Sequence, residues 1–377
     1  MYIPYGRQSV SEEDIQAVVN VLRSYYLTTG PSVGEFEKTV AEYVGAKFAV
    51  AVANGTAALH IACLAAGIQP GDEVITSPIT FAASANCVLY CGGTPVFADV
   101  SADTYNINPE EIRKKITPRT KAIIPVHFTG QPCEMDEIRK VSKEYNLLII
   151  EDAAHTIGAD YKGKKIGGIS DMTIFSFHPV KHITTGEGGM VTTNDGRLYN
   201  RLKLFRTHGI TRDTDMMLSN EGGWYYEQLE LGFNYRITDF QCALGTSQMK
   251  RLDQFVARRH EIAKRYDKAF SEITGLITPK QKDGCNNSYH LYVLQTTKVE
   301  RKEMYDKLQA VRIGVNVHYL PVYKHPYYQK NGYVSVKCTN AEKIYSNFMS
   351  LPMYYGLTQE EQEYVIKEVI NIATIGG

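Results

Sequence analysis

Six short apolar runs, rich in β-branched residues and separated by amphipathic stretches, constrain the fold of this chain more than any other feature. They are FAVAVA (48–53), DEVITS (72–77), TPVFADV (94–100), KAIIPVHF (121–128), NLLIIED (146–152) and TIFSF (173–177). Runs of this length are typical of strands that are buried on both faces. Their alternation with helical stretches predicts an α/β fold with a mostly parallel, doubly wound sheet.

The pattern changes near residue 247. Residues 248–273 place apolar and charged side chains at helical spacing, and this helix is long enough to connect two bodies. Two predicted strands and a final helix follow, at 288–296, 314–322 and 360–374. We therefore expect a large domain over residues 1–247, which includes an N-terminal arm, and a smaller α+β domain over residues 248–377.

Charge and cysteine content argue against several partners and compartments. The 41 basic and 41 acidic residues give a formal net charge of zero, which disfavours nucleic acid and anionic membranes as partners. The seven cysteines are scattered and include no CxxC pair, as is typical of a reducing compartment. No secretory signal is evident, and no apolar run approaches the ~20 residues that span a bilayer. We expect a cytoplasmic protein.

Residues that directly follow the apolar runs are the first candidates for a site, because the carboxyl ends of parallel strands meet at one edge of a sheet. They are Asn54 to Thr56, Thr80, Phe81, His127, Asp152, His155, and Ser176 to Lys181. A carboxylate buried at the end of a strand needs a cationic partner. A direct salt bridge between Asp152 and Lys181 and a cofactor held between them are both compatible with this spacing.

Pyridoxal phosphate has chemical demands that these residues could meet. It needs an amine for a Schiff base, a carboxylate against its ring nitrogen, and main-chain donors for its phosphate. The turn NGTAAL (54–59) opens a helix and offers free N–H groups. Other motifs fail: GADYKGKK (158–165) lacks the hydroxyl residue of a phosphate loop, and no GxGxxG follows a strand. No metal-ligand spacing is present, so we expect no metal.

Several longer motifs resemble those of one family. EDAAH (151–155), FSFHPVKHITTGEGG (175–189) and GFNYRITDFQCALG (232–245), with LTTGPSVGEFE (27–37) and NGTAALH (54–60), are similar to the DegT/DnrJ/EryC1/StrS sugar aminotransferases. The similarity covers nearly the whole chain, in order. It implies an aspartate-aminotransferase-like fold, fold type I among enzymes that use pyridoxal 5′-phosphate, and a homodimer with shared active sites.

The resemblance also implies roles for individual residues. Lys181 would form the Schiff base and move the proton, Asp152 would pair with the pyridine nitrogen, and His155 would lie beside the ring. Phe81 would stack on the opposite face. The phosphate would be held by Gly55, Thr56, Ala57 and Ser176, and by Asn234 from the partner subunit.

Two further stretches, SPITFAASANCVLYCG (77–92) and VNVHYLPVY (315–323), are similar to the family members that aminate C4 of a UDP-linked 4-keto-6-deoxy-N-acetylhexosamine for pseudaminic acid, with L-glutamate as donor. The family pattern gives these UDP-sugar contacts: Tyr5, Tyr25, Tyr26, Leu27, Thr28, Gly55, Ser176, Asn234, His318, Tyr319, Leu320 and Pro321. Packing of an N-terminal arm would also explain Tyr5, and an ordinary strand end would also explain the segment from His318 to Pro321.

Some assignments stay open. Arg236 is a candidate for binding the donor carboxylate, although a surface or interface salt bridge would explain it equally. His178 matches the family motif without a clear role, and His182 stands where relatives often have proline, so we expect His182 to be solvated or structural. The segment 211–230 is longer than expected in near relatives.

Three other functions compete with this one. The first is another nucleotide-sugar aminotransferase, such as UDP-4-amino-4-deoxy-L-arabinose synthase. The second is the deoxysugar dehydratase branch of the same fold, in which a histidine replaces the lysine, and Lys181 disfavours it. The third is a non-catalytic binding protein on the same scaffold.

Overall fold

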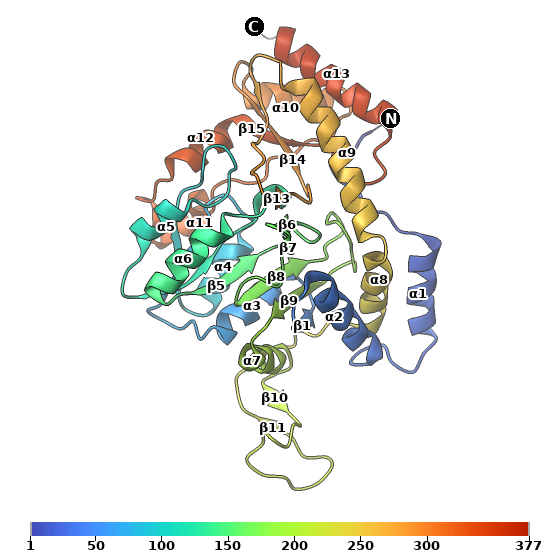
Figure 1. The fold of residues 1–377 in the computed structure, drawn as a ribbon, viewed down its shortest axis with the longest axis vertical. Helices are drawn as coiled ribbons and strands as arrows, with labels where there is room; N and C mark the ends of the chain where they lie inside the picture. The colour runs from blue at the N-terminus through green and yellow to red at the C-terminus, as the bar shows by residue number, and fades with distance from the viewer. Residues whose placement is uncertain (1, 376–377) are drawn as a thin grey trace.

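A central sheet of seven strands organises the chain, of which a computed structural model describes residues 2–375 (Figure 1). The strand order is β1-β9-β8-β5-β4-β2-β3. Their bounds are Phe48–Val52 (β1), Glu73–Thr76 (β2), Thr94–Phe97 (β3), Thr120–Ile124 (β4), Leu148–Asp152 (β5), Met172–Ser176 (β8) and Gly189–Thr193 (β9).

All six apolar runs predicted to be strands lie in this sheet, and their strands run parallel to one another. The prediction of an α/β fold with a mostly parallel sheet is therefore confirmed. Strand β9 was not predicted: its sequence GMVTT is short and starts at a glycine. It lies between β1 and β8 and is antiparallel to both, which lets its neighbours keep the common direction.

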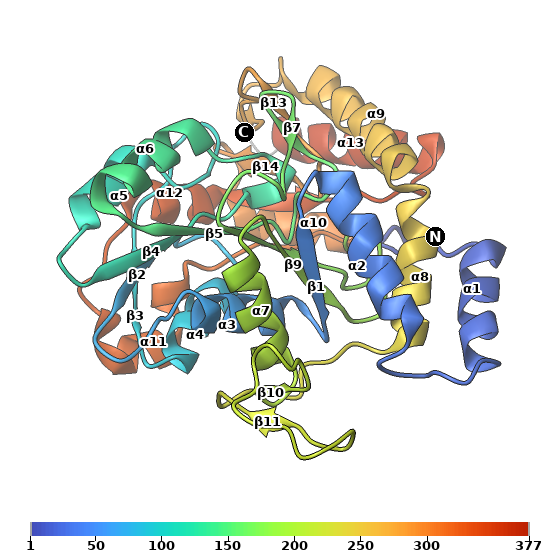
Figure 2. The same ribbon diagram turned by 60° about the horizontal axis from the view of Figure 1, so that its bottom comes forward.

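Helices cover both faces of the sheet (Figure 2). One apolar cluster packs α3, α4 and α7 against one face, and a second packs α2, α5, α6 and α8 against the other. The bounds are Pro31–Val44 (α2), Gly55–Ala65 (α3), Ala83–Tyr90 (α4), Pro109–Lys115 (α5), Met135–Tyr145 (α6), Gly196–Arg206 (α7) and Asp239–Met249 (α8). This arrangement leaves the strand ends, where loops enter and leave, as the accessible edge.

The C-terminal part has its own three-stranded sheet, in the order β12-β14-β15. Helix α9 leads into it, and helices α10 and α13 pack on it. The bounds are Leu252–Phe270 (α9), Leu276–Ile277 (β12), Tyr292–Thr296 (β14), Arg301–Ala310 (α10), Pro326–Tyr328 (α11), Thr339–Asn347 (α12), Phe348–Leu351 (β15) and Gln359–Ile375 (α13). The strand predicted over 314–322 is wrong, because this stretch makes only one isolated bridge there, Asn316 to Ser350.

Both parts of the chain contribute to a shared apolar cluster. Phe97 and Phe128 of the large part pack with Val293, Tyr323 and Phe348 of the C-terminal part. A small sheet of β13 (Cys285–Asn286), β6 (Asp160–Tyr161) and β7 (Lys164–Lys165) also joins the two. The arm at the N-terminus bonds to the C-terminal part, since Ile3 N–H donates to the Arg312 carbonyl (3.0 Å).

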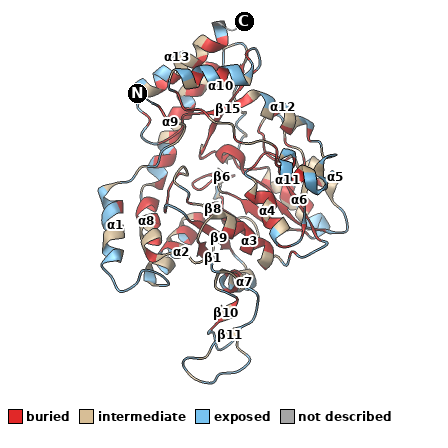
Figure 3. Cartoon of the chain, turned by 180° about the vertical axis from the view of Figure 1, so that it is seen from behind, coloured by how far each residue is buried: buried red, intermediate tan, exposed pale blue. Residues whose placement is uncertain are grey.

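The segment 211–230 forms a hairpin that projects from the body below α7 (Figure 1). Its short strands are β10 (Ile210–Thr211) and β11 (Glu227–Gln228). Figure 3 shows that the buried residues concentrate around the central sheet, whereas the outer part of the hairpin is mostly exposed. Leu218 and the single tryptophan, Trp224, are both largely exposed there. Over residues 2–375, no helix combines the length and the apolar character needed to cross a membrane.

Helix α1 (Glu12–Leu22) is attached to α8 through one buried carboxylate. Asp14 is fully buried and accepts hydrogen bonds from the Ser247 hydroxyl (2.6 Å), the Gln248 amide and the Arg251 guanidinium. It also closes the capping box with Ser11 at the start of the helix. Removal of the carboxylate would leave buried donors without an acceptor.

We expect Asp14→Ala to lower the free energy of unfolding by about 2–4 kcal/mol, because it breaks a buried charged network. Urea unfolding followed by circular dichroism measures this change. Glu12→Ala, an exposed change in the same helical turn, is the matched control and should have little effect. Equal stability of the two variants would contradict the assignment of Asp14 as the anchor of α1.

Candidate active site

A cavity of about 950 Å³ lies at the carboxyl edge of the parallel strands, where the C-terminal part meets the large sheet. Its walls come from the ends of β1, β5 and β8, the start of α3, and the stretch after residue 314. These predicted site residues line it: Tyr5, Gly55, Thr56, Ala57, Phe81, Asp152, His155, Ser176, Lys181, His318 and Tyr319. The sequence pattern thus brought together residues that are up to 314 positions apart, from Tyr5 to Tyr319.

Other predicted residues do not line the cavity of their own chain. They are Tyr25, Tyr26, Leu27, Thr28, Asn234, Leu320 and Pro321. Tyr25 is completely exposed, and Asn234 is exposed at a bridge with Thr207. Arg236, the candidate for the donor carboxylate, also lies outside the lining. For any of these residues to act at this site, a second copy of the chain must bring it there or the segment that carries it must move.

Asp152 is the buried acid of the cavity. Its Oδ2 accepts a hydrogen bond from the Ser84 hydroxyl (2.6 Å) and its Oδ1 accepts one from the Ala154 N–H (3.2 Å). Burial raises the pKa of Asp152, and the Ser84 hydrogen bond, the Ala154 N–H and the charge of Lys181 oppose that rise. A cationic N–H placed in the cavity would complete this environment.

Lys181 supplies the amine, and it makes no direct ion pair with Asp152. Burial lowers the pKa of Lys181 to about 8, and the negative charge of Asp152 only partly opposes this change. The structure therefore disfavours the direct salt bridge and leaves space between acid and amine. An amine with such a pKa is partly unprotonated near neutral pH, as a nucleophile requires.

The start of α3 forms a cradle for an anion. Gly55 and Thr56 occupy its first helical positions, whose N–H groups have no partner within the helix. The Ala57 N–H is already used, because it donates to the Asn54 side chain (2.8 Å). A Cβ added to Gly55 would lie 3.0 Å from the Ser176 Cβ, so glycine permits the close approach of the Ser176 hydroxyl.

Aromatic and imidazole rings form another wall of the cavity. Phe81 is mostly exposed at the mouth and lies 6.0 Å from the Tyr319 ring, while His155 is buried and lies 4.3 Å from the His290 ring. Burial lowers the pKa of His155 and of His290 well below the usual range, and that of His318 to about 4. These rings are therefore neutral, and Lys181 is the one lysine or arginine among the lining residues.

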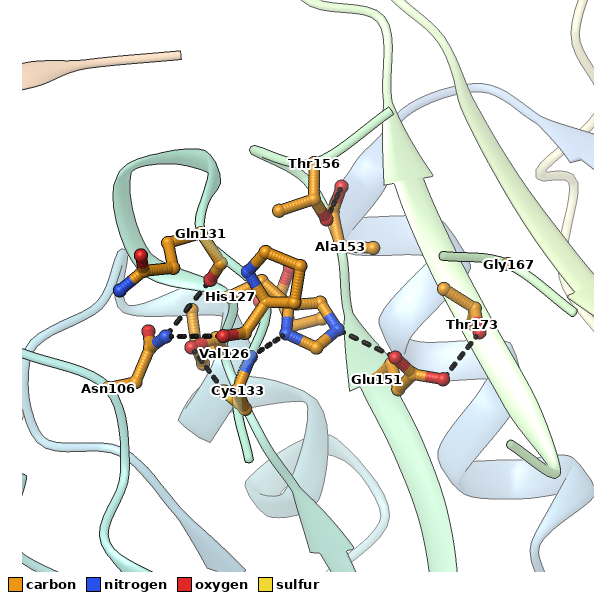
Figure 4. Close-up of polar contacts among 12 residues, drawn as sticks. Asn106, Val126, His127, Gln131, Cys133, Glu151, Ala153, Thr156, Gly167 and Thr173 are labelled. Atoms are coloured by element: carbon orange, nitrogen blue, oxygen red, sulfur yellow. Dashed lines mark hydrogen bonds and ion pairs between the residues drawn. The ribbon is translucent and has the colours of Figure 1, made fainter. Parts of the chain in front are cut away.

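His127 was a candidate from its place at a strand end, but it belongs to a separate network (Figure 4). The ring is fully buried; Nε2 lies 2.6 Å from the Glu151 carboxylate, and Nδ1 accepts from the Cys133 N–H (2.9 Å). Glu151 precedes Asp152 on β5, and successive strand residues point to opposite faces. His127 therefore stabilises the face of the sheet that is turned away from the cavity.

Several polar residues of the cavity were missed, and Ser84 and His290 are the two nearest to the acid and the amine. Ser84 lies in the apolar stretch FAASAN, where nothing in the sequence indicates that its hydroxyl faces Asp152. His290 lies in a predicted strand of the C-terminal part, 109 residues from Lys181, and spacing alone gave no signal for it. His178 and Glu187 line the cavity as exposed residues, and His182 is buried with Nε2 donating to the Ser288 carbonyl (2.9 Å).

The three demands of pyridoxal phosphate are all met in one cavity. Lys181 provides a half-buried amine of lowered pKa, and Asp152 provides a buried carboxylate without a cationic partner in contact. Gly55 and Thr56 provide free N–H groups, with the Ser176 hydroxyl beside them. The site residues therefore fit this cofactor.

Comparisons with known proteins agree with this geometry. The model of the DegT/DnrJ/EryC1/StrS aminotransferase family matches residues 8–370. The spore coat polysaccharide biosynthesis protein SpsC of Bacillus subtilis is 45% identical, over 98% of this chain and 97% of that protein. A UDP-4-amino-4,6-dideoxy-N-acetyl-β-L-altrosamine transaminase of Campylobacter jejuni is 38% identical, again over 98% and 97%.

Solved structures are similar over the whole fold. PseC of Helicobacter pylori, described as an aminotransferase involved in the biosynthesis of pseudoaminic acid, superposes with a TM-score of 0.92 at 33% identity, covering 98% of this chain and 99% of that one. The sugar aminotransferase Spr1654 of Streptococcus pneumoniae, described as putative and solved in its PMP form, gives a TM-score of 0.92 at 30% identity, covering 100% of both chains.

We expect the Lys181 amine of the cofactor-free protein to titrate near pH 8, whereas an ordinary lysine titrates near 10.5. Labelling with acetic anhydride across a pH series, read by peptide mass spectrometry, gives this midpoint. Because the unfolded chain keeps the proton up to about pH 10.5, the free energy of unfolding should also rise with pH between these two values. A midpoint near 10.5 would contradict the inferred burial of the amine.

Proposed function

This chain belongs to the DegT/DnrJ/EryC1/StrS aminotransferase family, and on that premise we propose that it moves an amino group from L-glutamate to C4 of a UDP-linked 4-keto-6-deoxy-N-acetylhexosamine. The substrate would be UDP-2-acetamido-2,6-dideoxy-β-L-arabino-hexos-4-ulose and the product UDP-4-amino-4,6-dideoxy-N-acetyl-β-L-altrosamine. The observation that carries the proposal is the half-buried Lys181 amine of lowered pKa, which makes no ion pair with the buried Asp152 carboxylate of the same cavity. An intact lysine disfavours the dehydratase branch, and its lowered pKa disfavours a non-catalytic scaffold.

Pyridoxal 5′-phosphate is the cofactor of these aminotransferases, and when bound it withdraws electrons from the carbon that carries the migrating amino group. Lys181 would hold it covalently and, once freed, take a proton from one carbon and return it to another. Asp152 would keep a positive charge on the ring nitrogen. Gly55, Thr56 and Ser176 would bind the phosphate, and Ala57 would complete the helical turn that surrounds it.

The sugar nucleotide would enter from the mouth of the cavity. His318 and Tyr319 of the C-terminal part line one side together with Tyr5 of the N-terminal arm, whose ring lies 5.4 Å from that of His318, and Phe81 lies beside Tyr319. Two hydrogen bonds hold the His318 ring: its Nδ1 lies 2.8 Å from the Ser350 hydroxyl, and its Nε2 lies 3.2 Å from the Asn316 side-chain amide nitrogen. A rigid neutral imidazole beside a tyrosine suits recognition of sugar hydroxyl and amide groups. The C4 specificity is supported by the name of the 38% identical relative.

A second candidate keeps the chemistry and changes the sugar. A relative at 45% identity is named for spore coat polysaccharide biosynthesis and not for pseudaminic acid, which supports a different sugar as acceptor. UDP-4-amino-4-deoxy-L-arabinose synthesis is one reaction of this kind. The two candidates differ in the mass of the aminated product.

We also propose a homodimer with shared active sites. Exposed apolar side chains gather near α1 at Ile15 and Leu22 and continue at Tyr25 and Leu27, and such clusters mark protein interfaces. The cavity of one chain offers one cation, Lys181, although the cofactor and the UDP moiety both carry phosphates. Asn234, exposed and outside its own cavity, would reach the phosphate of the partner's site.

Incubation with L-glutamate and each candidate UDP-4-keto sugar tests the reaction, with product mass as the readout. We expect the yellow holoenzyme to bleach on addition of glutamate and to aminate the 4-keto-6-deoxy-N-acetylhexosamine. Lys181→Ala should reduce turnover at least about 10⁴-fold, because both covalent attachment and proton transfer are lost. Near-wild-type turnover by this variant, or a wild-type protein that does not bleach, would overturn the proposed activity.

Mixing two inactive variants tests the shared site. If Asn234 acts in the partner's site, heterodimers of Lys181→Ala and Asn234→Ala contain one intact site. Random subunit exchange should then restore about a quarter of wild-type activity, since half of the dimers are mixed and each has one of two sites intact. Absence of any recovery after verified exchange would place Asn234 outside the partner's site.

A further inference from the structure

Among the side chains that the structure describes, His290 is the one within hydrogen-bonding distance of the Lys181 amine. Its Nε2 lies 3.5 Å from the lysine Nζ. It comes from the segment that leads into β14, so the C-terminal part reaches the catalytic amine of the large part. We propose that His290 is a positioning residue, whose Nε2 accepts a hydrogen bond from Lys181 Nζ and keeps the amine apart from Asp152. This inference rests on the proposed function of Lys181.

The backbone holds His290 firmly. The buried Arg259 guanidinium donates to the carbonyls of Tyr289 (3.0 Å), His290 (3.1 Å) and Met353 (3.1 Å). On the other side, the Leu291 N–H donates to the Thr129 carbonyl (3.0 Å). The ring is therefore presented to Lys181 by a clamp that includes both parts of the chain.

A glycine allows this approach. Gly130 has a φ of +115°, and a Cβ there would lie 2.7 Å from the Tyr289 N and 2.9 Å from the His290 N. Any other residue would push the His290 segment away from the large part. The close contact thus sets the distance between the imidazole and the amine.

The His290 imidazole can accept a hydrogen bond from the Lys181 ammonium, and it does not compete with the lysine for the proton. Burial lowers the pKa of His290 well below its usual range, and the positive charge of Lys181 adds to that effect. A protonated lysine can only donate, so the neutral ring must be its acceptor. His182 does not take this role, because its Nε2 donates to the Ser288 carbonyl and its Nδ1 lies within hydrogen-bonding distance of no described residue.

The charged and titratable groups around the Lys181 amine come from several elements. They are Asp152 at the end of β5, His155 after it, His182 beside the lysine, His290 before β14, His318 and Tyr319 after α10, and Arg259 of α9 behind the histidines. Asp152 is the one acid among them. Without an acceptor at the His290 position, the ammonium would have Asp152 as its remaining partner in this group.

The pKa of Lys181 in the cofactor-free protein tests the proposal without any substrate. His290→Phe keeps the ring volume and removes the acceptor, so the ammonium turns to the Asp152 carboxylate, and its midpoint should rise by about one unit, a tenfold change in acid dissociation. His290→Gln, which places an amide oxygen near the Nε2 position, should stay close to wild type. Acetic anhydride labelling with mass spectrometry measures each midpoint.

The matched control is His182→Gln, a buried histidine of the same cluster whose hydrogen bond goes to a carbonyl. It should lower the melting temperature without moving the Lys181 midpoint. Should His290→Phe fail to fold, His290→Asn provides a smaller variant whose amide is too short to reach Nζ. An unchanged midpoint in a folded variant without the acceptor would overturn the proposal.

Holoenzyme kinetics provide a second readout. We expect His290→Phe to lower kcat at least about tenfold, with the KM of glutamate and sugar within about twofold, because the amine is misplaced while substrate contacts remain. A purely structural role would instead lower the amount of folded enzyme at unchanged kcat per active site. If the wild-type enzyme does not bleach with glutamate, the proposed function fails, whatever the labelling of His290 variants shows.

Discussion

The burial of one carboxylate governs this site. Asp152 lies at the end of a parallel strand with its side chain almost inaccessible, and a charge in that position is costly unless hydrogen bonds and a cation compensate it. Ser84 and the Ala154 N–H supply the hydrogen bonds, and Lys181 supplies charge without contact. The arrangement therefore leaves an unmet demand for a cationic N–H between acid and amine. A pyridine ring with a proton on its nitrogen would meet that demand.

The same strand serves two purposes through the alternation of its side chains. Asp152 faces the cavity, while the preceding Glu151 faces the opposite side and pairs with His127 and Thr173. Both carboxylates are buried, and each has a dedicated hydrogen-bonding network. The network of Glu151, His127 and Thr173 fixes the strand that presents Asp152. The geometry of the cavity therefore depends on packing that lies outside the cavity.

Sequence reasoning was most successful where one physical rule decided the outcome. Buried parallel strands need continuous apolar runs, and the residues that follow them meet at one edge, which placed Gly55, Asp152, Ser176 and Lys181 in one cavity. It failed where the outcome depended on tertiary partners. Strand β9 (GMVTT) has only two strongly apolar residues after its glycine, so its sequence does not stand out. The stretch 314–322 lacks the partners that would make it a strand, and Ser84 is an ordinary helix residue until Asp152 lies beside it. Residues such as Asn234, if they act in a second copy, cannot be placed from one chain at all.

His290 shows why the two parts of the chain form one functional unit. The large part supplies the lysine itself, and the lowered pKa of its amine follows from burial to which both parts of the chain contribute. Its orientation, however, comes from an imidazole that the Arg259 clamp and the narrow contact at Gly130 hold in place. The apolar cluster of Phe128, Val293 and Phe348 ties these elements together. Separation of the two parts would therefore leave the lysine in place but release its acceptor, so the docking of the C-terminal part controls the position of the amine as well as the shape of the sugar pocket.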